Sequence, residues 1–371
     1  MITIAHIGDG HLGKRQYGLA QRDEDTKNAL SHCFKDAIAA NVDVIILPGD
    51  MFDTSKPTAD NVEHLADLVA MAKARGIRVI GIDGNHDKAG SSFFKRSWLS
   101  VCRVETFEDL TPIKIKGVNF YGINHHLPNA FKDKLCESVD HFVQQKINID
   151  VLVIHQSVAE LCNFNGVELT AEWMAEQLSM VNTRYVAMGD IHDHDIGVYN
   201  EITFCYPGSV EMTAKNEKPG KRWVKVLINL EEGQVSTASQ KIPTRKYRLY
   251  NIEKFEDIAA MVNEVKDKYL DNLIIVDVST DILDGHKTVY RVLKDMDVLC
   301  RVNTYPGQKQ DDETSSDISV PMWERAESVN TVLAAIEEFH EPDSDEYQLI
   351  KAMLDTPKEV AVIAEGWLNG N

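Results

Sequence analysis

The sequence predicts an α/β fold in which a mainly parallel sheet is covered by helices. Short apolar runs typical of buried strands alternate with amphipathic stretches of helical length through the first half of the chain. This alternation is typical of parallel strands that are joined by helices. Side chains of metal-ligand type also follow one expected strand after another, and ligand sites form at such strand ends.

The elements of the first domain are expected in a regular order. Strands are predicted at residues 2–7, 42–47, 77–82, 150–154 and 185–188, and helices at residues 24–40, 61–75 and 130–146. The first helix has an apolar face made of Ala29, Leu30, Cys33, Phe34 and Ala37. Gly76 is placed to end the second helix, and Gly117 is expected to turn a hairpin between residues 114–116 and 118–122.

The second half of the chain changes in character. Strands at residues 222–229 and 235–240 complete a first domain that we expect to end at residue 242. Residues 243–306 are predicted to form a small α/β domain, with strands at 246–250, 273–278 and 298–304 and helices at 256–268 and 284–293. Residues 307–319 are polar and acidic and predict a linker, which leads to a helical tail at residues 320–371.

The tail carries a narrow apolar stripe suited to packing against another helix. Its side chains recur at steps of four and three, at Met322, Ala326, Val329, Leu333, Ile336 and His340. Packing on the protein's own domain would explain the stripe as well as packing on a partner, so both interpretations stay open.

Length, cysteine content and charge restrict the class of protein. The chain has 371 residues, 43% of them hydrophobic, which suits about two folded domains. It has no apolar run of about 18 residues, and Asp9 and His11 interrupt its first apolar stretch, so we expect neither a membrane span nor a secretory leader. Six scattered cysteines without a CxxC pair predict reduced thiols in a cytoplasm. The net charge of −19 lies largely in residues 311–371, so it weighs only mildly against a DNA substrate.

Five short segments carry side chains that suit metal binding. They hold Asp9 and His11, then Asp50 and Asp53, then Asn85, His86 and Asp87, then His155, and finally Asp190, His192 and His194. Each segment directly follows an expected strand. Because the carboxyl ends of parallel strands lie along one edge of a sheet, we expect these distant segments to converge there.

The ligand types predict two metal ions. Oxygen and imidazole ligands without thiolates suit hard or borderline ions such as Mn²⁺, Mg²⁺, Fe²⁺ or Zn²⁺. Asp50 could bridge both ions, with Asp9, His11 and His192 completing one ion and Asn85, His155 and Asp190 completing the other. Two ions about 3.5–4 Å apart can hold both the attacking and the leaving oxygen of a displacement.

The other polar residues of these segments have supporting roles in this hypothesis. His86 could protonate the leaving oxygen or hold the phosphate. Asp53, Asp87 and His194 are expected to support ligands or cap turns rather than to bind the ions. Four glycines are expected to let the backbone turn sharply beneath the ions, namely Gly8, Gly49, Gly84 and Gly189. A single histidine after a strand is commonly an ordinary hydrogen-bonded residue, so the joint pattern carries the prediction.

The five segments resemble the calcineurin-like metallophosphoesterase pattern of DxH, GDxxD, GNHD, a lone His and GHxH, over residues 1–230. The stretches HIGDGHLGKRQYGLAQRDED and VDVIILPGDMFDTSKPT are similar to the SbcD and meiotic-recombination-eleven group of DNA-repair nucleases. This resemblance implies a four-layer αββα metallophosphoesterase sandwich with a small α/β capping domain and a helical C-terminal tail. By position it implies the ligand sets given above and a catalytic role for His86.

The same resemblance implies an activity and partners. The activity would be a 3′→5′ exonuclease on duplex DNA and an endonuclease on single strands, dependent on two Mn²⁺ ions, with Mg²⁺ as a second choice. The partners would be DNA, a second copy bound through helices near residues 58–75 and 92–100, and an SMC-like coiled-coil ATPase bound through the tail. The setting would be the cytoplasm of a bacterium or of a phage-infected host.

The chain departs from this family at one ligand. Where the family has GHxH, this chain has GDIH, so Asp190 stands where a histidine is expected. A carboxylate can bind a hard ion, and we therefore expect a working site. The alternatives are a weak second metal site or replacement of the missing ligand by His194.

Basic residues near the metal motifs are candidates for phosphate contact. Lys14, Arg15 and Arg22 follow the first motif, and Lys88, Lys95 and Arg96 follow the third. A further group follows the fifth motif, at Lys215, Lys218, Lys221 and Arg222. Solvated surface charge explains any one of these residues equally well.

Two other functions use the same residues. A phosphatase or cyclic-nucleotide phosphodiesterase would have the same metal core, but it would need neither a capping domain nor a helical tail. A non-catalytic adaptor of the ATPase would carry a site degraded at Asp190 and would act through its tail.

Overall fold

The computed structural model describes residues 1–87, 97–162, 166–282 and 284–305. The linker expected at residues 307–319 and the tail expected at residues 320–371 lie outside these described residues. Most of the second dimer segment, residues 92–100, also lies outside them.

The first sheet has six strands in the order β12-β11-β1-β2-β3-β4. They are β1 (Ile2–His6), β2 (Val44–Leu47), β3 (Arg78–Gly81), β4 (Glu105–Thr106), β11 (Arg222–Asn229) and β12 (Gln234–Lys241). β1 pairs in parallel with β2 and antiparallel with β11, while β2, β3 and β4 continue in parallel. The carboxyl ends of β1, β2 and β3 therefore lie at one edge.

The second sheet also has six strands, in the order β5-β6-β7-β8-β10-β9. They are β5 (Ile113–Ile115), β6 (Val118–Ile123), β7 (Val151–His155), β8 (Tyr185–Gly189), β9 (Asp195–Tyr199) and β10 (Ile202–Tyr206). β6, β7, β8 and β10 are parallel, and antiparallel pairs at β5–β6 and β9–β10 form the two edges. The β5–β6 hairpin turns at Gly117, as predicted, with a φ of 86°.

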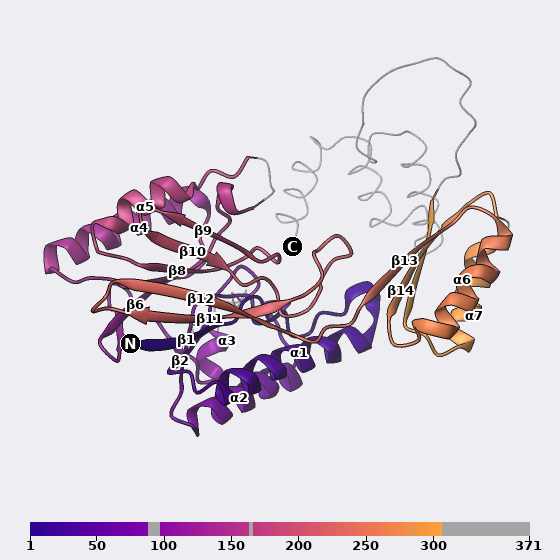
Figure 1. The fold of residues 1–371 in the computed structure, drawn as a ribbon, viewed down its shortest axis with the longest axis horizontal. Coiled ribbons are helices and arrows are strands. Elements are labelled where there is room, and N and C mark those ends of the chain that lie inside the picture. Colours follow the sequence, from indigo (N-terminus) through magenta and orange to yellow (C-terminus); the bar gives the residue numbers. More distant parts are fainter. Residues whose placement is uncertain (88–96, 163–165, 283, 306–371) are drawn as a thin grey trace, which may run out of the picture. The chain divides into compact units, whose positions relative to one another are not determined.

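Helices cover the outer faces of the two sheets, and an apolar layer fills the space between the sheets (Figure 1). α1 (Ala20–Ala39) and α2 (Ala59–Lys73) pack on the first sheet, and α4 (Pro128–Gln145) and α5 (Ala171–Ser179) pack on the second. This is the four-layer sandwich that the resemblance implied. The single sheet expected from strand–helix alternation is wrong, because alternation does not reveal where one sheet ends and the next begins.

The small α/β domain has a parallel sheet of its own. Its strands are β13 (Tyr247–Ile252), β14 (Leu273–Ser279) and β15 (Cys300–Tyr305), and its helices are α6 (Phe255–Lys268) and α7 (Gly285–Asp295). Both helices lie on the same side of the sheet in Figure 1. Their apolar faces and the strands enclose a separate core around Val265, Val276 and Leu293.

Several elements differ from the prediction. α1 begins at Ala20 rather than at residue 24, because its first turn buries the polar Arg22, which an apolar pattern does not detect. The pattern did not indicate α5, β9 or β10, nor the short elements η1 (Gln16–Gly18), α3 (Trp98–Val101) and η2 (Ala159–Leu161). All six cysteines are free, and the described part of the chain has no helix long and apolar enough to span a membrane.

Candidate metal centre

The predicted ligands converge at the edge where strands of both sheets end. Asp9 and His11 follow β1, Asp50 follows β2, and Asn85 and His86 follow β3 of the first sheet. His155 ends β7, and Asp190 and His192 follow β8, in the second sheet. The site is therefore built by two facing sheets, not by the edge of one sheet.

The first ligand group joins the two sheets. Each of Asp9, His11 and His192 offers a ligand atom within 4.8 Å of those of the other two. The Nε2 atoms of His11 and His192 lie 3.0 Å apart. Two imidazole nitrogens that share an ion at about 2.1 Å are roughly 3 Å apart, so this geometry suits a shared cation.

The second ligand group is centred on His155, which is completely buried. Its Nε2 lies 3.4 Å from Asp50 Oδ2, 3.0 Å from Asn85 Oδ1 and 3.8 Å from Asp190 Oδ1. Its Nδ1 donates to the carbonyl of Pro48 at 2.8 Å, which directs Nε2 toward these oxygens. The four predicted residues of the second ion thus lie together.

The role of Asp50 differs in detail from the prediction. Asp50 Oδ1 accepts a hydrogen bond from the backbone of His86 at 2.9 Å, so one of its oxygens already holds the third motif in place. Asp9 is the carboxylate that belongs to both ligand groups, since it also lies with Asp50 and His155. Either carboxylate could connect two ions.

The charge balance of the group indicates that a cation belongs there. Asp9 is completely buried, and its Oδ2 has no hydrogen-bond partner among the described residues. Burial raises the pKa of Asp9 although three histidines oppose the shift. Burial would lower the pKa of His155, but a hydrogen bond and attraction to Asp50 raise it to about 10. A bound cation would satisfy the unpaired oxygen, so the residues present fit a metal.

His86 and Asp53 lie beside the first ligand group. His86 Nδ1 donates to the backbone carbonyl of Asp53 at 2.7 Å, and its Nε2 is 3.9 Å from Asp50 Oδ2. The His86 side chain is 39% exposed, so it is open to a substrate. The carboxylate of Asp53 lies 3.4 Å from His11 Nδ1 and 2.9 Å from Lys14 Nζ, which places Asp53 behind a ligand.

Asp87 caps the turns beneath the ions. Its carboxylate accepts hydrogen bonds from the backbones of Met51, Phe52 and Gly84 at 3.0–3.3 Å. Burial, followed by repulsion from Asp50, raises the pKa of Asp87 to about 7. These hydrogen bonds fit the turn-capping role that was expected for Asp87.

Asp190 keeps a position from which it can act as a ligand. Its backbone donates to Asp9 Oδ1 at 3.0 Å, and its carboxylate accepts a hydrogen bond from Ser157. His194 directs its Nδ1 to the carbonyl of Tyr206 at 2.6 Å, whereas Asp190 Oδ1 lies 3.8 Å from Nε2 of His155. The geometry favours Asp190 over His194 as the replacement for the family histidine.

Two of the four motif glycines show why a side chain cannot be accommodated. Gly49 has a φ of +98°, a conformation that other residues rarely adopt, and a Cβ there would lie 2.6 Å from His155 Nδ1. A Cβ on Gly84 would lie 2.1 Å from Asp50 Oδ1. Gly8, Gly84 and Gly189 do not have a positive φ, but a Cβ at each would lie 2.1–2.5 Å from another atom, so these glycines are required for close approach.

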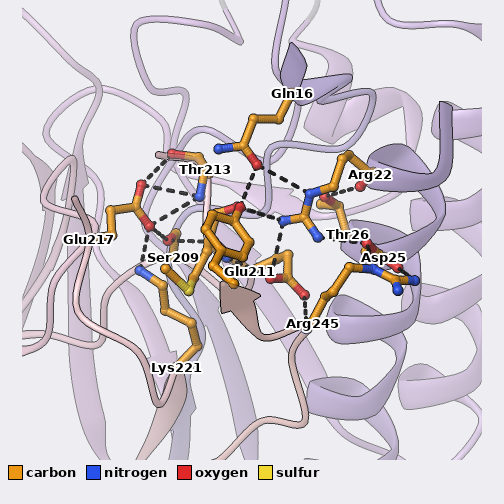
Figure 2. A network of polar contacts seen from close by, with 12 residues as sticks. Gln16, Arg22, Asp25, Thr26, Ser209, Glu211, Thr213, Glu217, Lys221 and Arg245 are labelled. Carbon is orange, nitrogen blue, oxygen red and sulfur yellow. Dashed lines mark hydrogen bonds and ion pairs between the residues drawn. The ribbon is translucent and has the colours of Figure 1, made fainter. Parts of the chain in front are cut away.

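Glu217 is part of the site although no sequence pattern indicated it. Its Oε1 lies 3.0 Å from His192 Nδ1, and Lys221 donates to its Oε2 at 2.6 Å (Figure 2). Burial would raise the pKa of Glu217, but hydrogen bonding from His192 and attraction to Lys221 lower it well below its usual range. A carboxylate behind an imidazole fixes the tautomer that leaves Nε2 for a metal. Nothing in the spacing of Glu217 linked it to His192.

Two of the expected phosphate contacts are wrong. Arg22 is 1% exposed, and its guanidinium is held by Asp25, Glu211 and the Met212 carbonyl (Figure 2). Lys221 is 4% exposed and donates to Glu217 and to the His192 carbonyl. Both cations are used inside the protein, because buried charges require partners there.

Other basic residues remain on the surface near the site. Arg15 and Lys218 are exposed, and Lys14 and Lys215 are 32% and 51% exposed at their side chains. Three predicted contacts, Lys88, Lys95 and Arg96, lie outside the described residues.

Comparison with known proteins gives one family match. The family described as calcineurin-like phosphoesterase matches residues 2–194. This segment contains all seven predicted ligands and His86.

The chain is also similar to archaeal proteins named DNA double-strand break repair protein Mre11. It is 32% identical to that of Saccharolobus solfataricus over 198 residues, which cover 52% of this chain and 50% of the relative. It is 26% identical to that of Methanosarcina mazei over 296 residues, which cover 76% of this chain and 45% of the relative. It is 22% identical to that of Methanocaldococcus jannaschii over 277 residues, which cover 71% and 73%. The chain spans about half the length of the first two relatives.

Proposed function

Because the chain belongs to the calcineurin-like phosphoesterase family, we propose that it is a metal-dependent phosphodiesterase that cleaves DNA. The observation that carries this proposal is the meeting of carboxylates and imidazoles from both sheets around the unpaired Oδ2 of Asp9. The proposed ligands of one ion are Asp9, His11 and His192 with Asp50, and those of the other are Asn85, His155 and Asp190 with Asp50.

The residues divide the chemistry between them. Two bound ions would supply a hydroxide nucleophile near neutral pH and would stabilise charge on the phosphate oxygens. Because His86 Nδ1 donates to the Asp53 carbonyl, Nε2 is left free on the side of Asp50, where a protonated Nε2 could give its proton to the leaving oxygen. Glu217 keeps His192 oriented, and the Asp53 carboxylate lies 3.4 Å from Nδ1 of His11.

The choice of DNA as substrate rests on the relatives and on the architecture. The similar proteins carry a name that refers to repair of DNA double-strand breaks. The small α/β domain contacts the first domain close to the metal centre, through Tyr247, which donates to the Met212 carbonyl at 2.9 Å. We propose 3′→5′ exonuclease activity on duplex DNA and endonuclease activity on single strands, with Mn²⁺ preferred over Mg²⁺.

The proposed partners follow from the same resemblance. They are a second copy of the chain, bound in part through α2, and an SMC-like ATPase bound through residues 320–371, in a cytoplasmic setting. The ATPase contact concerns residues outside the described structure, so it stands on the apolar stripe of the sequence. Replacing Leu333 and Ile336 with Asp should weaken ATPase binding and leave the nuclease activity of the isolated chain unchanged.

The activity is tested with the purified full chain, Mn²⁺ and labelled duplex DNA. We expect cleavage that EDTA abolishes and that His86→Ser lowers by about 10²- to 10⁴-fold, the usual contribution of a general acid. His286→Ser is the matched control, because His286 is an exposed histidine of the small domain. Wild-type activity in this control shows that the loss belongs to the position of His86.

Small substrates separate the two alternatives. Hydrolysis of p-nitrophenyl phosphate with DNA left intact would reject the nuclease and favour a phosphatase. Absence of all hydrolysis in Mn²⁺ or Mg²⁺, together with tight ATPase binding, would favour the adaptor.

A further inference from the structure

A pocket of about 470 Å³ lies beside the metal centre and is lined by residues of both the first and the small domain. Asp53 forms part of its wall, and Asp53 Oδ1 is 3.4 Å from Nδ1 of the ligand His11. Asn303 of β15 contributes from the small domain. A group bound in this pocket would therefore be adjacent to the place where the scissile phosphate is expected.

The charge of the pocket suits a polyanion. Lys14, Arg15 and Lys215 all line it, whereas Asp53 is its one lining carboxylate among the described residues. Lys14 donates to Asp53 at 2.9 Å, and Lys215 lies 3.6 Å from Asp277. The excess of positive charge can attract a phosphodiester backbone at this side of the site.

Tyr17 gives the same pocket an aromatic wall. Its backbone has φ 59° and ψ 22°, a left-handed conformation that is uncommon for a residue other than glycine. Such conformations persist where surrounding contacts hold them, and they concentrate at functional sites. The guanidinium of Arg301 lies over the Tyr17 ring, 5.8 Å from its centroid, which adds a further cation beside one face of the ring.

The buried polar network in Figure 2 holds Tyr17 and the opposite wall in place. Gln16, which precedes Tyr17, is 6% exposed and accepts hydrogen bonds from Arg22 Nε at 3.2 Å and from the hydroxyl of Tyr247. The opposite wall includes Thr213, whose backbone donates to Glu217. Both walls are anchored, so the pocket is organised before a ligand arrives.

Resting on the proposed cleavage of DNA, we propose that this pocket binds one unpaired nucleotide of the substrate strand, with its base stacked on Tyr17 and its phosphate facing Lys14 and Lys215. An aromatic side chain within a basic groove is the usual means of holding single-stranded nucleic acid without sequence preference. A base inside a duplex is already stacked on both faces, so the pocket selects frayed ends and single strands.

The test measures binding without cleavage. Fluorescence anisotropy of the metal-free full chain in EDTA is measured with a fluorescein-labelled oligothymidylate and with an abasic deoxyribose-phosphate strand of equal length. Tyr17→Ala should weaken binding of the oligothymidylate about tenfold and leave the abasic strand unchanged, because only the base stacks on the ring. Tyr17→Phe keeps the aromatic face and should bind like the wild type.

Lys215→Ala is the complementary variant. It should weaken the binding of both strands to a similar extent and reduce the salt dependence of binding, because it removes a phosphate contact. The inference is overturned if Tyr17→Ala binds oligothymidylate as tightly as the wild type does, or if it loses equal affinity for both strands. It is also overturned if the wild-type chain binds neither strand. Thermal unfolding of each variant identifies any loss of affinity that comes from misfolding. If Tyr17→Ala misfolds, the affinities of Tyr17→Phe and Tyr17→Leu for oligothymidylate are compared instead.

Failure of the pocket proposal and failure of the nuclease proposal can be distinguished. If the wild type binds through Tyr17 but cleaves no DNA in Mn²⁺, the nucleotide pocket stands and the nuclease proposal fails. If the wild type cleaves DNA but Tyr17→Ala binds normally, the nuclease proposal stands and the pocket fails.

Discussion

The metal centre and the cluster around Arg22 are both buried polar regions, but their hydrogen-bonding capacity is used differently. Arg22 bonds through all three guanidinium nitrogens, to Gln16, Asp25, Glu211, the Met212 carbonyl and Tyr247. Asp25 also receives two bonds from Arg245 at 2.6 and 2.8 Å. In the metal centre, Asp9 Oδ2 has no such partner among the described residues.

The contrast distinguishes buried polar groups that connect parts of the fold from buried polar groups that are available to a ligand. A buried polar group that is fully paired inside the protein connects parts of the fold, and here the Arg22 cluster connects α1, the loop after β10 and the small domain (Figure 2). A buried carboxylate oxygen without a partner is costly and is retained where an external group completes it. Gln16 Nε2, at the edge of the Arg22 cluster, has no hydrogen-bond partner among the described residues, and Gln16 lines the pocket for which we propose nucleotide binding.

The largest expected effect is on activity, from Asp9→Asn. The variant should lose Mn²⁺ binding and at least roughly a thousandfold of the hydrolysis rate, as is common for an essential catalytic group. Its metal-free form should be no less stable than the wild type in urea, because the variant removes a buried charge whose Oδ2 has no partner among the described residues, while an amide oxygen can still accept from the Asp190 backbone. Calorimetric Mn²⁺ titration and urea unfolding measure the two quantities. A clear drop in the stability of the metal-free variant would show that Asp9 has a structural role, as Arg22 has, and would remove the contrast between the two regions.

Arg22→Met should have the opposite effects: it should lower the stability of the protein rather than its Mn²⁺ binding. It leaves Glu211 buried without its main partner and removes one of the two arginines that pair with Asp25, so we expect the free energy of unfolding to fall by about 3–5 kcal/mol. Arg15→Met serves as the matched control, since Arg15 is exposed and its loss should change stability by less than about 0.5 kcal/mol. Urea unfolding measures both variants. Equal stability of the two would contradict a structural role for Arg22.

A smaller effect is expected from Glu217, which belongs to both regions. Glu217→Ala should weaken Mn²⁺ affinity at one of two sites by about 10- to 100-fold, because His192 loses the group that orients it. Glu217→Gln should lose less Mn²⁺ affinity, since its amide oxygen can still accept a hydrogen bond from His192 Nδ1. Isothermal titration with Mn²⁺ gives the two affinities. Equal weakening at both sites would indicate a general loss of structure instead.

The smallest effect is a pH dependence of the Arg22 cluster. Burial would raise the pKa of Asp25, but hydrogen bonding and attraction from Arg245, and then from Arg22, lower it. A lowered carboxyl pKa contributes stability that is complete above the unfolded value of about 4 and is lost as the pH falls through the folded value. The unfolding free energy of Asp25→Asn should therefore fall less steeply than that of the wild type below about pH 4. Parallel slopes in urea unfolding over this range would contradict the assignment.

The candidate site was predictable from the chain because each ligand follows a strand at short range. Asp9, Asp50 and Asn85 stand directly after apolar runs that became β1, β2 and β3, and the residue types alone indicate hard metal ions. The structure brings these residues together with His155 and Asp190, as the pattern predicted. The same local patterns located the strands and helices of the small domain.

Interactions between distant residues were not predictable in this way. Arg22 follows a metal motif and so was expected to contact DNA, but its partner Glu211 lies 189 positions away along the chain. Glu217 lies 25 positions from His192 in a loop without a distinctive motif. Strand–helix alternation was equally compatible with one sheet and with two, and the structure has two.

By itself, the sequence determined the α/β class, the candidate metal-ligating residue types and the strands and helices around the small third sheet, because these depend on periodicity and on residues adjacent to a strand. The tertiary structure decided which buried charges are paired internally and which oxygen is left for a cation. Pairing depends on distances between elements far apart in the chain, and only the packing of the two sheets and the small domain sets those distances.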